Sequence, residues 1–280
     1  MSKRKRISSV EKNIKNGRGQ GIGVSYQPYI KIQDVPSLGR SSRLKGNKVP
    51  RQFDFLSDLE RNFFYLLEFS DHVIDIKEQY SLLPVEETMS IADELGIKHP
   101  RDRKTGEYFP MTTDFLITYR NHDGEIINLA RTLKYKQDLL DERTLEKFEI
   151  ERVYWEKKDI DWGIVTELEI PKIMTENISY VSSYYNLFDK DGFEKLNSED
   201  ISDICKVMVD MLVDEKITVN AIAKKIDKNF GLLSGCGLSI FKYMLANKII
   251  SIDLKNKINL NEIVKIQINE TGFYPKVESL

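Results

Sequence analysis

The sequence predicts an α/β protein in which a domain built on a mixed β-sheet is followed by a mainly helical domain. From about residue 56 to residue 169, segments with helical or strand periodicity follow one another in the order helix, strand, hairpin, helix, strand. Beyond about residue 170 the chain becomes rich in Asn, Ile, Lys and Tyr, and three helical segments precede two short β segments. With 280 residues and 41% hydrophobic content, the chain can give each domain its own core.

The first helix and strand of the sheet domain are predicted from apolar spacing. One face of a helix collects apolar residues spaced at a 3.6 period, with Ser57 or Asp58 as the cap: Leu56, Leu59, Phe63, Leu66 and Leu67. The next segment, VIDIKEQYSLLP, alternates like a strand and ends near Pro84. The stretch after it, VEETMSIADELGIKHP, is helical or irregular.

A hairpin, a helix and a strand complete this domain. The hairpin joins MTTDFLITYR to EIINLARTLKYK through the turn signal NHDG. The helix is predicted over DERTLEKFEIERVYWEKKD, with Asp141 as its cap and with Leu145, Phe148 and Val153 facing inward. The segment WGIVTELEI then predicts a buried strand.

The last third of the chain has the element order of a winged helix, in which three helices precede a β-hairpin. Residues 171–280 carry 14 Lys and Arg against 15 Asp and Glu, and the candidate recognition helix, LSGCGLSIFKYMLANK, offers only Lys242 and Lys248 as basic residues. A helix that reads a DNA groove normally lies on a basic face. This balance favours a protein-docking domain over a DNA reader, with a purely structural role as the third interpretation.

The N-terminal segment is strongly basic, although the whole chain has a net charge of −2. Residues 1–51 contain 13 Lys and Arg against Glu11 and Asp34, a local balance of +11. The segment is rich in Gly and Ser and lacks the apolar periodicity to fold alone, so we expect it to bind a phosphate backbone. A solvated tail is the alternative. The expected DNA-binding residues are Arg4, Lys5, Arg6, Arg18, Arg40, Arg43, Lys45 and Lys48.

Three residues of the sheet domain form a candidate catalytic constellation: Glu60, Asp114 and Lys134. If the hairpin pairs around its NHDG turn, Asp114 and Lys134 lie near the same end of adjacent strands. Carboxylate oxygens suit Mg²⁺ or Mn²⁺, which would polarise a phosphoryl oxygen and lower the pKa of a bound water. The Lys134 ammonium would orient that water and offset the charge that develops in the transition state.

Each member of the constellation also has a simpler explanation. Glu60 near a helix start interacts favourably with the helix dipole for no functional reason. Lys134 could protect an edge strand from pairing with another chain. Asp114 is harder to explain in this way, because Asp is a poor strand former and no turn is expected at its position.

Several other residues are interpreted without a catalytic role. Tyr154 and Trp155 are predicted to be core, and Glu149 and Glu151 are more typical of a solvated helix face than of support for the site. The histidines His72, His99 and His122 lack metal-ligand spacing. The alternating glycines from Gly17 to Gly23 do not fit a nucleotide-binding loop, and they suggest close approach of a flexible basic backbone to DNA.

The cysteines and the hydropathy exclude further classes of protein. Cys205 and Cys236 have neither disulfide-framework nor zinc-site spacing. No window approaches 18 uncharged apolar residues, and the N-terminus lacks the apolar region of a signal peptide. We therefore expect a cytoplasmic protein that is not secreted and makes no membrane contact.

Ordered sequence blocks between residue 17 and about residue 170 resemble the TnsA endonuclease family, the nuclease subunits of Tn-seven-like heteromeric transposases. The matching blocks are GRGQGIGVSY, QDVPSLGRSSR, LSDLE, VIDIKEQYSLLP, GIKHP, MTTDFL and DERTLEKFEIERVYW. The resemblance implies a restriction-endonuclease-like catalytic domain over residues 52–170, with the basic arm of residues 1–51 as part of it. Residues 171–280 would form the winged-helix-like interaction domain.

The family's catalytic residues fall on the same three positions. Its glutamate falls on Glu60, its aspartate on Asp114 and its lysine on Lys134. Two residues before the lysine, where this fold often has Glu, Asp or Gln, the chain has Thr132, which is a weaker metal ligand and puts a second ion in doubt. The backbone carbonyl of Leu133 is expected to substitute as a ligand.

The resemblance also implies a function and partners. The family cuts DNA at the 5′ ends of the transposon with Mg²⁺, for which Mn²⁺ would substitute, while the TnsB transposase cuts and joins the 3′ ends. The ATP-dependent regulator TnsC is expected to bind chiefly through the C-terminal domain, and the free subunit is expected to be inactive or nearly so without its partners. The protein is expected to be associated with the bacterial nucleoid. The alternatives are a stand-alone restriction or repair nuclease and a catalytically inactive assembly factor, which Thr132 favours.

Overall fold

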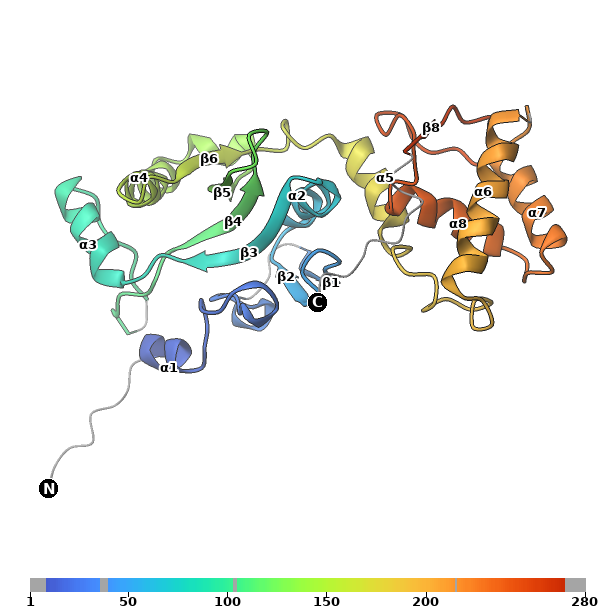
Figure 1. Ribbon diagram of the computed structural model, residues 1–280. Coiled ribbons are helices and arrows are strands. Elements are labelled where there is room, and N and C mark those ends of the chain that lie inside the picture. Colours follow the sequence, from blue (N-terminus) through green and yellow to red (C-terminus); the bar gives the residue numbers. More distant parts are fainter. Residues whose placement is uncertain (1–8, 36–39, 103–104, 215, 270–280) are drawn as a thin grey trace, which may run out of the picture. The chain divides into compact units, whose positions relative to one another are not determined.

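The structure of the protein is a computed structural model that describes residues 9–35, 40–102, 105–214 and 216–269 (Figure 1). The chain divides into two compact units, residues 1–170 and residues 171–280. The first unit contains the four-stranded sheet, and the second unit consists mainly of helices. An α/β chain with its sheet in the N-terminal part was expected from the order of the predicted elements, and this expectation is confirmed.

The sheet of the first unit is mixed, with the strand order β3-β4-β5-β6. Three strands are antiparallel: β3 (Val73–Ser81), β4 (Thr112–Arg120) and β5 (Ile126–Leu133). The fourth, β6 (Asp161–Val165), runs parallel to β5. The predicted hairpin is therefore confirmed, with Arg120 paired to Ile126 across the turn. The last strand is shorter than predicted and is not a buried strand, since only Val165 in it is buried.

Helices cover both faces of this sheet (Figure 1). On one face, α2 (Asp58–Phe69) packs in a core cluster with β2 (Gln52–Phe55) and with Phe115 and Ile117 of β4. On the other face, α3 (Val85–Glu94) and α4 (Glu142–Glu156) pack in a second cluster with Leu116 and Ala130. Alternate residues of one strand thus enter different cores, as the two-residue period of a strand requires.

The capping residues of two helices were predicted correctly. The Ser57 hydroxyl accepts a hydrogen bond from the amide of Glu60 at 3.1 Å at the start of α2. The Asp141 carboxylate accepts one from the amide of Thr144 at 2.9 Å at the start of α4. Both side chains satisfy amides that have no partner inside their own helix.

The inward face predicted for α4 was wrong at Leu145, which is 46% exposed, and correct at Val153, which packs against the second cluster. Glu151, Tyr154 and Trp155 of the same helix are buried. The Trp155 indole donates a hydrogen bond to the Thr113 hydroxyl at 2.7 Å, and its ring lies beside that of Tyr80. The large aromatic rings fill the space under the sheet and so fix the rotation of the helix; their core position is as predicted.

The basic N-terminal segment folds onto the first unit. It contains α1 (Ser9–Lys15) and β1 (Ser42–Lys45), which pairs with β2, and short helical turns, η1 (Gly23–Ser25) and η2 (Ile32–Asp34). Tyr26 is buried, and its hydroxyl donates to the carbonyl of Glu78 at 3.1 Å. At Gly21, with a φ of +99°, a Cβ atom would lie 2.4 Å from the carbonyl oxygen of Ser25. The glycine run therefore builds a tight turn, and its interpretation as flexible backbone was wrong.

A buried ion pair joins this segment to the sheet. The Arg51 guanidinium donates to both Glu78 carboxylate oxygens, at 2.9 and 2.5 Å, and to the carbonyl of Ile76 at 2.9 Å. The two side chains are 6% and 0% exposed. The guanidinium also lies over the Phe53 ring, 3.7 Å from its centroid. These hydrogen bonds offset part of the free energy that it costs to take both charges out of water.

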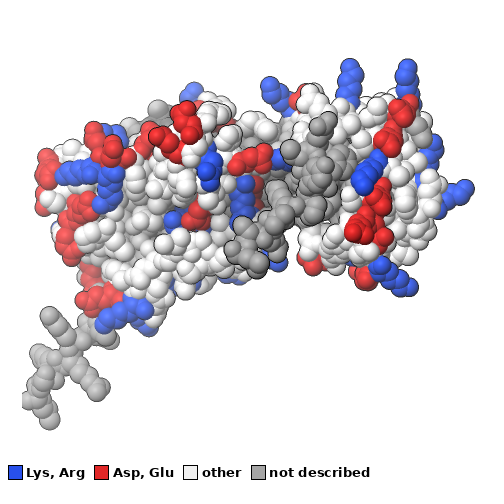
Figure 2. Space-filling view, in the orientation of Figure 1, with Lys and Arg blue, Asp and Glu red and all other residues white. Residues whose placement is uncertain are grey.

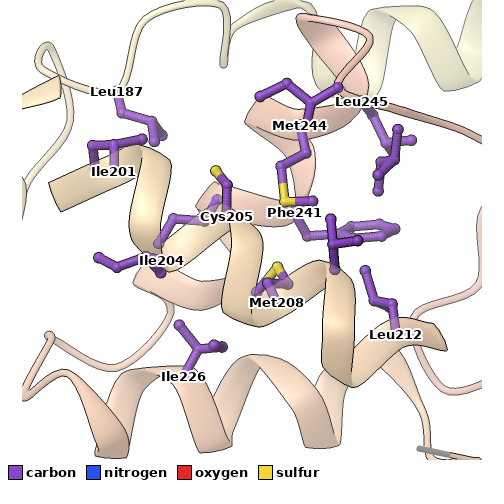
Figure 3. Close-up of a cluster of buried hydrophobic side chains, with 14 of the residues drawn as sticks. Leu187, Ile201, Ile204, Cys205, Met208, Leu212, Ile226, Phe241, Met244 and Leu245 are labelled. Carbon is purple, nitrogen blue, oxygen red and sulfur yellow. The ribbon is translucent and has the colours of Figure 1, made fainter. Parts of the chain in front are cut away.

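The second unit packs helices around one apolar cluster (Figure 3). Its elements are α5 (Lys172–Ser182), α6 (Ser198–Asp214), α7 (Val219–Asn229), α8 (Cys236–Ala246), β7 (Ile250–Ser251) and β8 (Gln267–Ile268). Helix α5 was not predicted. At Gly237 a Cβ atom would lie 2.4 Å from the carbonyl oxygen of Ala223, so glycine is needed where α7 and α8 meet. Among the described residues, no helix combines the length and apolar character needed to cross a bilayer.

We predict that Arg51→Met lowers the free energy of unfolding by about 3–5 kcal/mol, because it leaves the Glu78 carboxylate buried without its partner. The matched control is Arg43→Met, since Arg43 is 53% exposed and 3.3 Å from Asp54, and it should cost less than about 1 kcal/mol. Urea denaturation measures both. Equal losses of unfolding free energy in the two variants would contradict this assignment. So would a double variant, Arg51→Met with Glu78→Gln, that is no more stable than Arg51→Met alone.

Candidate active site

Asp114 lies near the start of β4, where β4 and β5 stop pairing. Its Oδ2 atom accepts a hydrogen bond from the amide of Leu133 at 2.7 Å, and its Oδ1 atom accepts one from the side-chain amide of Gln79 at 2.9 Å. Burial raises the pKa of Asp114 to about 6, although these two hydrogen bonds and the nearby charge of Lys134 oppose the rise. The carboxylate is therefore held in place by both neighbouring strands.

Glu60 lies in the first turn of α2 and is 6% exposed. Its Oε1 atom accepts from the Ser57 hydroxyl at 2.8 Å, and its Oε2 atom accepts from the amide of Leu56 at 3.1 Å. Burial raises the pKa of Glu60 to about 8, and the negative charge of Asp114 contributes to that rise. Glu60 therefore takes part in the helix cap and also lies beside Asp114, so the simple explanation and the functional one hold together.

The pair of carboxylates fits a divalent cation. Two acids close together and away from water repel one another when both are ionised, and a cation between them relieves that repulsion. Each of the four oxygens that accept a hydrogen bond retains a further lone pair. Within the described part of the chain, no cluster of three His, Cys, Asp or Glu could hold a metal ion. This donor set suits Mg²⁺, which binds one or two carboxylates and takes its other ligands from water and substrate phosphate.

Lys134 directly follows β5, and its amide donates to the carbonyl of Val165 at 3.1 Å. Its side chain is 37% exposed, with the ammonium 3.9 Å from the Asp138 carboxylate. Its charge opposes the rise that burial causes in the pKa of Asp114. Burial lowers the pKa of Lys147 on α4, and the charge of Lys134 lowers it further. The structure thus brings Lys134 to Asp114, as the pairing of the hairpin predicted.

The two further ligands predicted from the resemblance lie next to these residues. The Leu133 amide holds Asp114, so the Leu133 backbone is part of the site. The Thr132 hydroxyl donates to the Glu151 carboxylate and accepts from the Trp162 indole at 3.3 Å. The Thr132 hydroxyl therefore contacts α4 through Glu151 and β6 through Trp162. A role as a metal ligand stays a prediction for Thr132 and for the Leu133 carbonyl.

Glu151 is an acid whose burial was missed at the level of sequence. It is 2% exposed and accepts hydrogen bonds from Thr113 at 2.6 Å, from Thr132 and from Trp162 at 3.0 Å. Burial raises the pKa of Glu151 to about 7, and the charge of Asp114 adds to the rise. Its interpretation as solvated helix face was wrong. The usable signal was its spacing of four residues from Trp155, which places the two side chains on one face of α4.

The predicted DNA-binding residues have different environments. Arg4, Lys5 and Arg6 lie outside the described residues. Arg18 is bonded to Asp34 and donates to the carbonyl of Tyr29 at 3.2 Å, so it holds the N-terminal segment together. Lys48 is partly exposed and lies close to Glu68; burial raises the pKa of Glu68, and the charge of Lys48 opposes that rise.

The exposed basic residues gather on the β1–β2 ribbon. Arg40, Arg43 and Lys45 are exposed, and a hollow of about 310 Å³ opens beside them. The hollow is lined by Arg43, Leu44, Lys45, Pro50, Arg51 and Gln52. Its surface suits contact with a phosphate backbone, since Arg and Lys side chains make most such contacts.

Two of the histidines meet in space although they are far apart in sequence. The rings of His72 and His122 are 5.1 Å apart between centroids, near the turn of the hairpin. The His72 Nδ1 atom lies 3.2 Å from the carbonyl oxygen of Arg120. His99 is buried against α3, with Nε2 2.9 Å from the Thr88 hydroxyl. None of these contacts involves Glu60, Asp114 or Lys134.

Known proteins similar to this chain share its division into two parts. Residues 70–167 match the family model described as TnsA-like endonuclease N terminal, and residues 169–254 match the one described as TnsA endonuclease C terminal. The chain is also 36% identical over 263 residues to the transposon Tn7 transposition protein TnsA of Escherichia coli, and the match covers 93% of this chain and 91% of that protein. Asp114 and Lys134 fall inside the first matched range.

We predict that Asp114→Asn raises the free energy of unfolding at pH 8 when no divalent metal is present. The folded pKa of Glu60, about 8, exceeds its ordinary value of 4.5, so the stability that Glu60 contributes is present below pH 4.5 and is lost as the pH rises through 8. Removing the charge of Asp114 lowers that folded pKa, and the gain should be on the order of 1 kcal/mol or more.

Urea denaturation at pH 5 and pH 8 measures this effect, and Asp123→Asn in the exposed hairpin turn serves as the matched control. The stability difference between Asp114→Asn and the wild type should be larger at pH 8 than at pH 5. A stability difference between the two proteins that is the same at pH 5 and at pH 8 would show that the two carboxylates do not repel one another.

Proposed function

Because the chain belongs to the TnsA endonuclease family, we propose that it is the nuclease that cuts DNA at the 5′ ends of a Tn-seven-like transposon during cut-and-paste transposition. The observation that carries the proposal is the meeting of Glu60 and Asp114 with Lys134 beside them. An acid pair with an adjacent lysine is suited to metal-assisted phosphodiester hydrolysis, and its members come from three separate parts of the first unit.

We propose Mg²⁺ as the cofactor, with Mn²⁺ able to replace it and with one or two ions bound. Glu60 and Asp114 would hold the ion through the lone pairs that their hydrogen bonds leave open, and the Leu133 carbonyl and the Thr132 hydroxyl are the further proposed ligands. The ion, when bound, supplies charge stabilisation at the scissile phosphate and makes a bound water more acidic.

The residues of the chain place the reactants and balance their charge. The Lys134 ammonium, which is partly exposed, donates a hydrogen bond to the attacking water or to a phosphate oxygen. The water oxygen bonds to phosphorus, and the bond to the 3′ oxygen breaks in line, leaving a 3′-hydroxyl and a 5′-phosphate. Gln79 and Leu133 hold Asp114 from either side, so its carboxylate does not rotate during the reaction.

DNA contact is proposed for the β1–β2 ribbon and the basic N-terminal segment. Arg40, Arg43 and Lys45 are exposed and would contact backbone phosphates, a type of binding that carries little sequence information. Arg18 is engaged with Asp34 and would support that surface from within. Arg4, Lys5, Arg6 and Lys48 remain predicted contacts.

The second unit is proposed to be a winged-helix-like docking domain for the regulator TnsC. The Lys242 ammonium, on the candidate recognition helix α8, lies over the ring of Tyr180 at 4.1 Å and that of Tyr184 at 4.6 Å. Most of the apolar side chains of α8 are buried in the core of the unit. Basic and acidic side chains alternate over the face of this unit in Figure 2. Such a surface suits a protein partner better than a DNA groove.

The proposed partners are transposon-end DNA, the TnsB transposase and TnsC. The end-cleavage role rests on family membership and on the site in the first unit. The partners follow from the role, because a nuclease with little sequence readout of its own needs other subunits to choose its site.

We predict that Asp114→Ala and Lys134→Ala each reduce cleavage at the 5′ ends by a factor on the order of 10²–10³ in a reaction with TnsB, TnsC, end DNA and Mg²⁺. Strand-specific end-labelling measures the cuts, and TnsB cleavage at the 3′ ends should persist. The matched controls are Asp123→Ala in the hairpin turn and Lys157→Ala at the far end of α4, which should cleave like the wild type.

Other outcomes of this reaction would favour the alternatives. Unchanged 5′ cleavage in both site variants would mean that the site is misassigned or that another subunit makes the cut, and it would favour an assembly factor. Efficient cleavage by the chain alone, with no dependence on TnsB or TnsC, would indicate a stand-alone restriction or repair nuclease.

The docking proposal predicts that TnsC with ATP slows amide hydrogen exchange in residues 171–280 of the full chain, and that end DNA alone does not. Protection by DNA alone, centred on α8, would instead identify the second unit as a DNA reader. The β1–β2 ribbon is the internal control, because we expect DNA to protect it.

A further inference from the structure

Gln79 is a buried amide that lies across from Asp114 in the sheet. The pairs on either side of it, Glu78 with Phe115 and Tyr80 with Thr113, place Gln79 opposite Asp114 in the register of β3 and β4. Its side-chain Nε2 atom donates to Asp114 Oδ1 at 2.9 Å, and the residue is 3% exposed. Nothing in the proposed chemistry needs this amide as a reactant, so its burial beside the acid pair calls for another explanation.

The backbone of Gln79 has an unusual conformation. Its φ is +46°, in the left-handed region that a residue with a Cβ atom rarely adopts. Such a conformation persists when the surroundings hold it, and it is commonest at functional sites. Here the N-terminal segment supplies the support, because the amide of Tyr29 donates to the carbonyl of Gln79 at 3.2 Å and the Tyr26 hydroxyl donates to the carbonyl of Glu78.

A neighbouring hydroxyl fixes the orientation of the amide. The Thr112 Oγ1 atom donates to Gln79 Oε1 at 3.0 Å, which turns the NH₂ group of Gln79 toward the acids. One proton of that group is bonded to Asp114. The same amide lies close to Glu60, where it opposes the rise that burial causes in the pKa of Glu60. A single amide on β3 is thus bonded to the carboxylate on β4 and faces the carboxylate on α2.

We propose that Gln79 is a positioning residue that holds the Glu60 and Asp114 carboxylates side by side, in the orientation a divalent ion needs, before the ion binds. This inference rests on the proposed function, since it assumes that the acid pair is a metal site. Two ionised acids otherwise tend to turn apart, and a donor between them offsets their repulsion. Partners of this kind, which bond to metal ligands and not to the metal, typically change metal affinity by about 10–100-fold when removed.

The test measures the dissociation constant for Mn²⁺ on the full chain without DNA, by the electron paramagnetic resonance signal of free Mn²⁺. Gln79→Leu removes the hydrogen bonds of the side-chain amide to Asp114 and Thr112 and keeps the bulk of the side chain. Gln79→Gly removes them and also relaxes the left-handed backbone. We expect both variants to bind Mn²⁺ about 10–100-fold more weakly than the wild type, although the glycine relieves strain and the leucine does not.

A matched control separates this effect from backbone relaxation. Asp159 has a φ of +54° and is exposed in the turn after α4, so Asp159→Gly relieves a similar conformation away from the site and should leave the Mn²⁺ affinity unchanged. A loss smaller than about fivefold in either folded Gln79 variant overturns the proposal. If neither variant folds, Thr112→Val decides: a loss of about threefold or more supports the proposal, and an unchanged affinity overturns it.

Asp114→Asn distinguishes a failure of this inference from a failure of the proposed function. If Asp114→Asn abolishes Mn²⁺ binding and the Gln79 variants retain it, only the positioning role is wrong. If Asp114→Asn retains Mn²⁺ binding as well, the acid pair is not the metal site and both proposals fail.

Discussion

The repulsion between two carboxylates, Glu60 and Asp114, is the constraint on which the rest of the first unit depends. Both acids lie away from water, and each makes ionisation of the other less favourable, which is one reason why the pKa of Glu60 rises to about 8. Without a cation this arrangement costs stability, so a protein retains it only where it has a use. A divalent metal beside a phosphate is the use that we propose for it, with Lys134 close to the two acids.

Four buried acids of the sheet domain show how the surroundings decide what an acid does. Glu78 is paired with Arg51 and remains a structural ion. Glu151 accepts hydrogen bonds from three side chains, which hold it in place. Burial raises the pKa of Glu151 to about 7. Among the described residues, Glu60 and Asp114 accept hydrogen bonds from neutral donors, and no arginine forms an ion pair with either of them. Their charge is left for a ligand to neutralise.

Local sequence signals predicted much of the fold and the central residues of the site. The caps at Ser57 and Asp141, the NHDG hairpin and the proximity of Asp114 to Lys134 depend on interactions within a few residues or across one turn. The family resemblance and the residue chemistry pointed to the same three positions. Helix α5 was missed, because its sequence, KIMTENISYVS, carries β-branched residues and Asn and Ser, which are weak helix formers.

What the sequence could not show depends on contacts between distant segments. The buried position of Glu151 follows from the rotation of α4 about its axis. That rotation is set by Trp155, which bonds to Thr113 on β4 and packs beside Tyr80 on β3. The left-handed backbone of Gln79 follows from the N-terminal segment, whose Tyr26 and Tyr29 are buried although no periodicity marks them as core. Tertiary packing decided these features over local preference.

Whether Glu60 and Asp114 bind a metal can be seen by diffraction from crystals of the full chain soaked in Mn²⁺, recorded at the manganese absorption edge. We expect an anomalous peak at about 2.0–2.2 Å from one oxygen of Glu60 and one oxygen of Asp114, with any further ligands from the Leu133 carbonyl, Thr132 or water. A Mn²⁺ peak held by other residues, with Glu60 and Asp114 free of metal at saturating Mn²⁺, would contradict it.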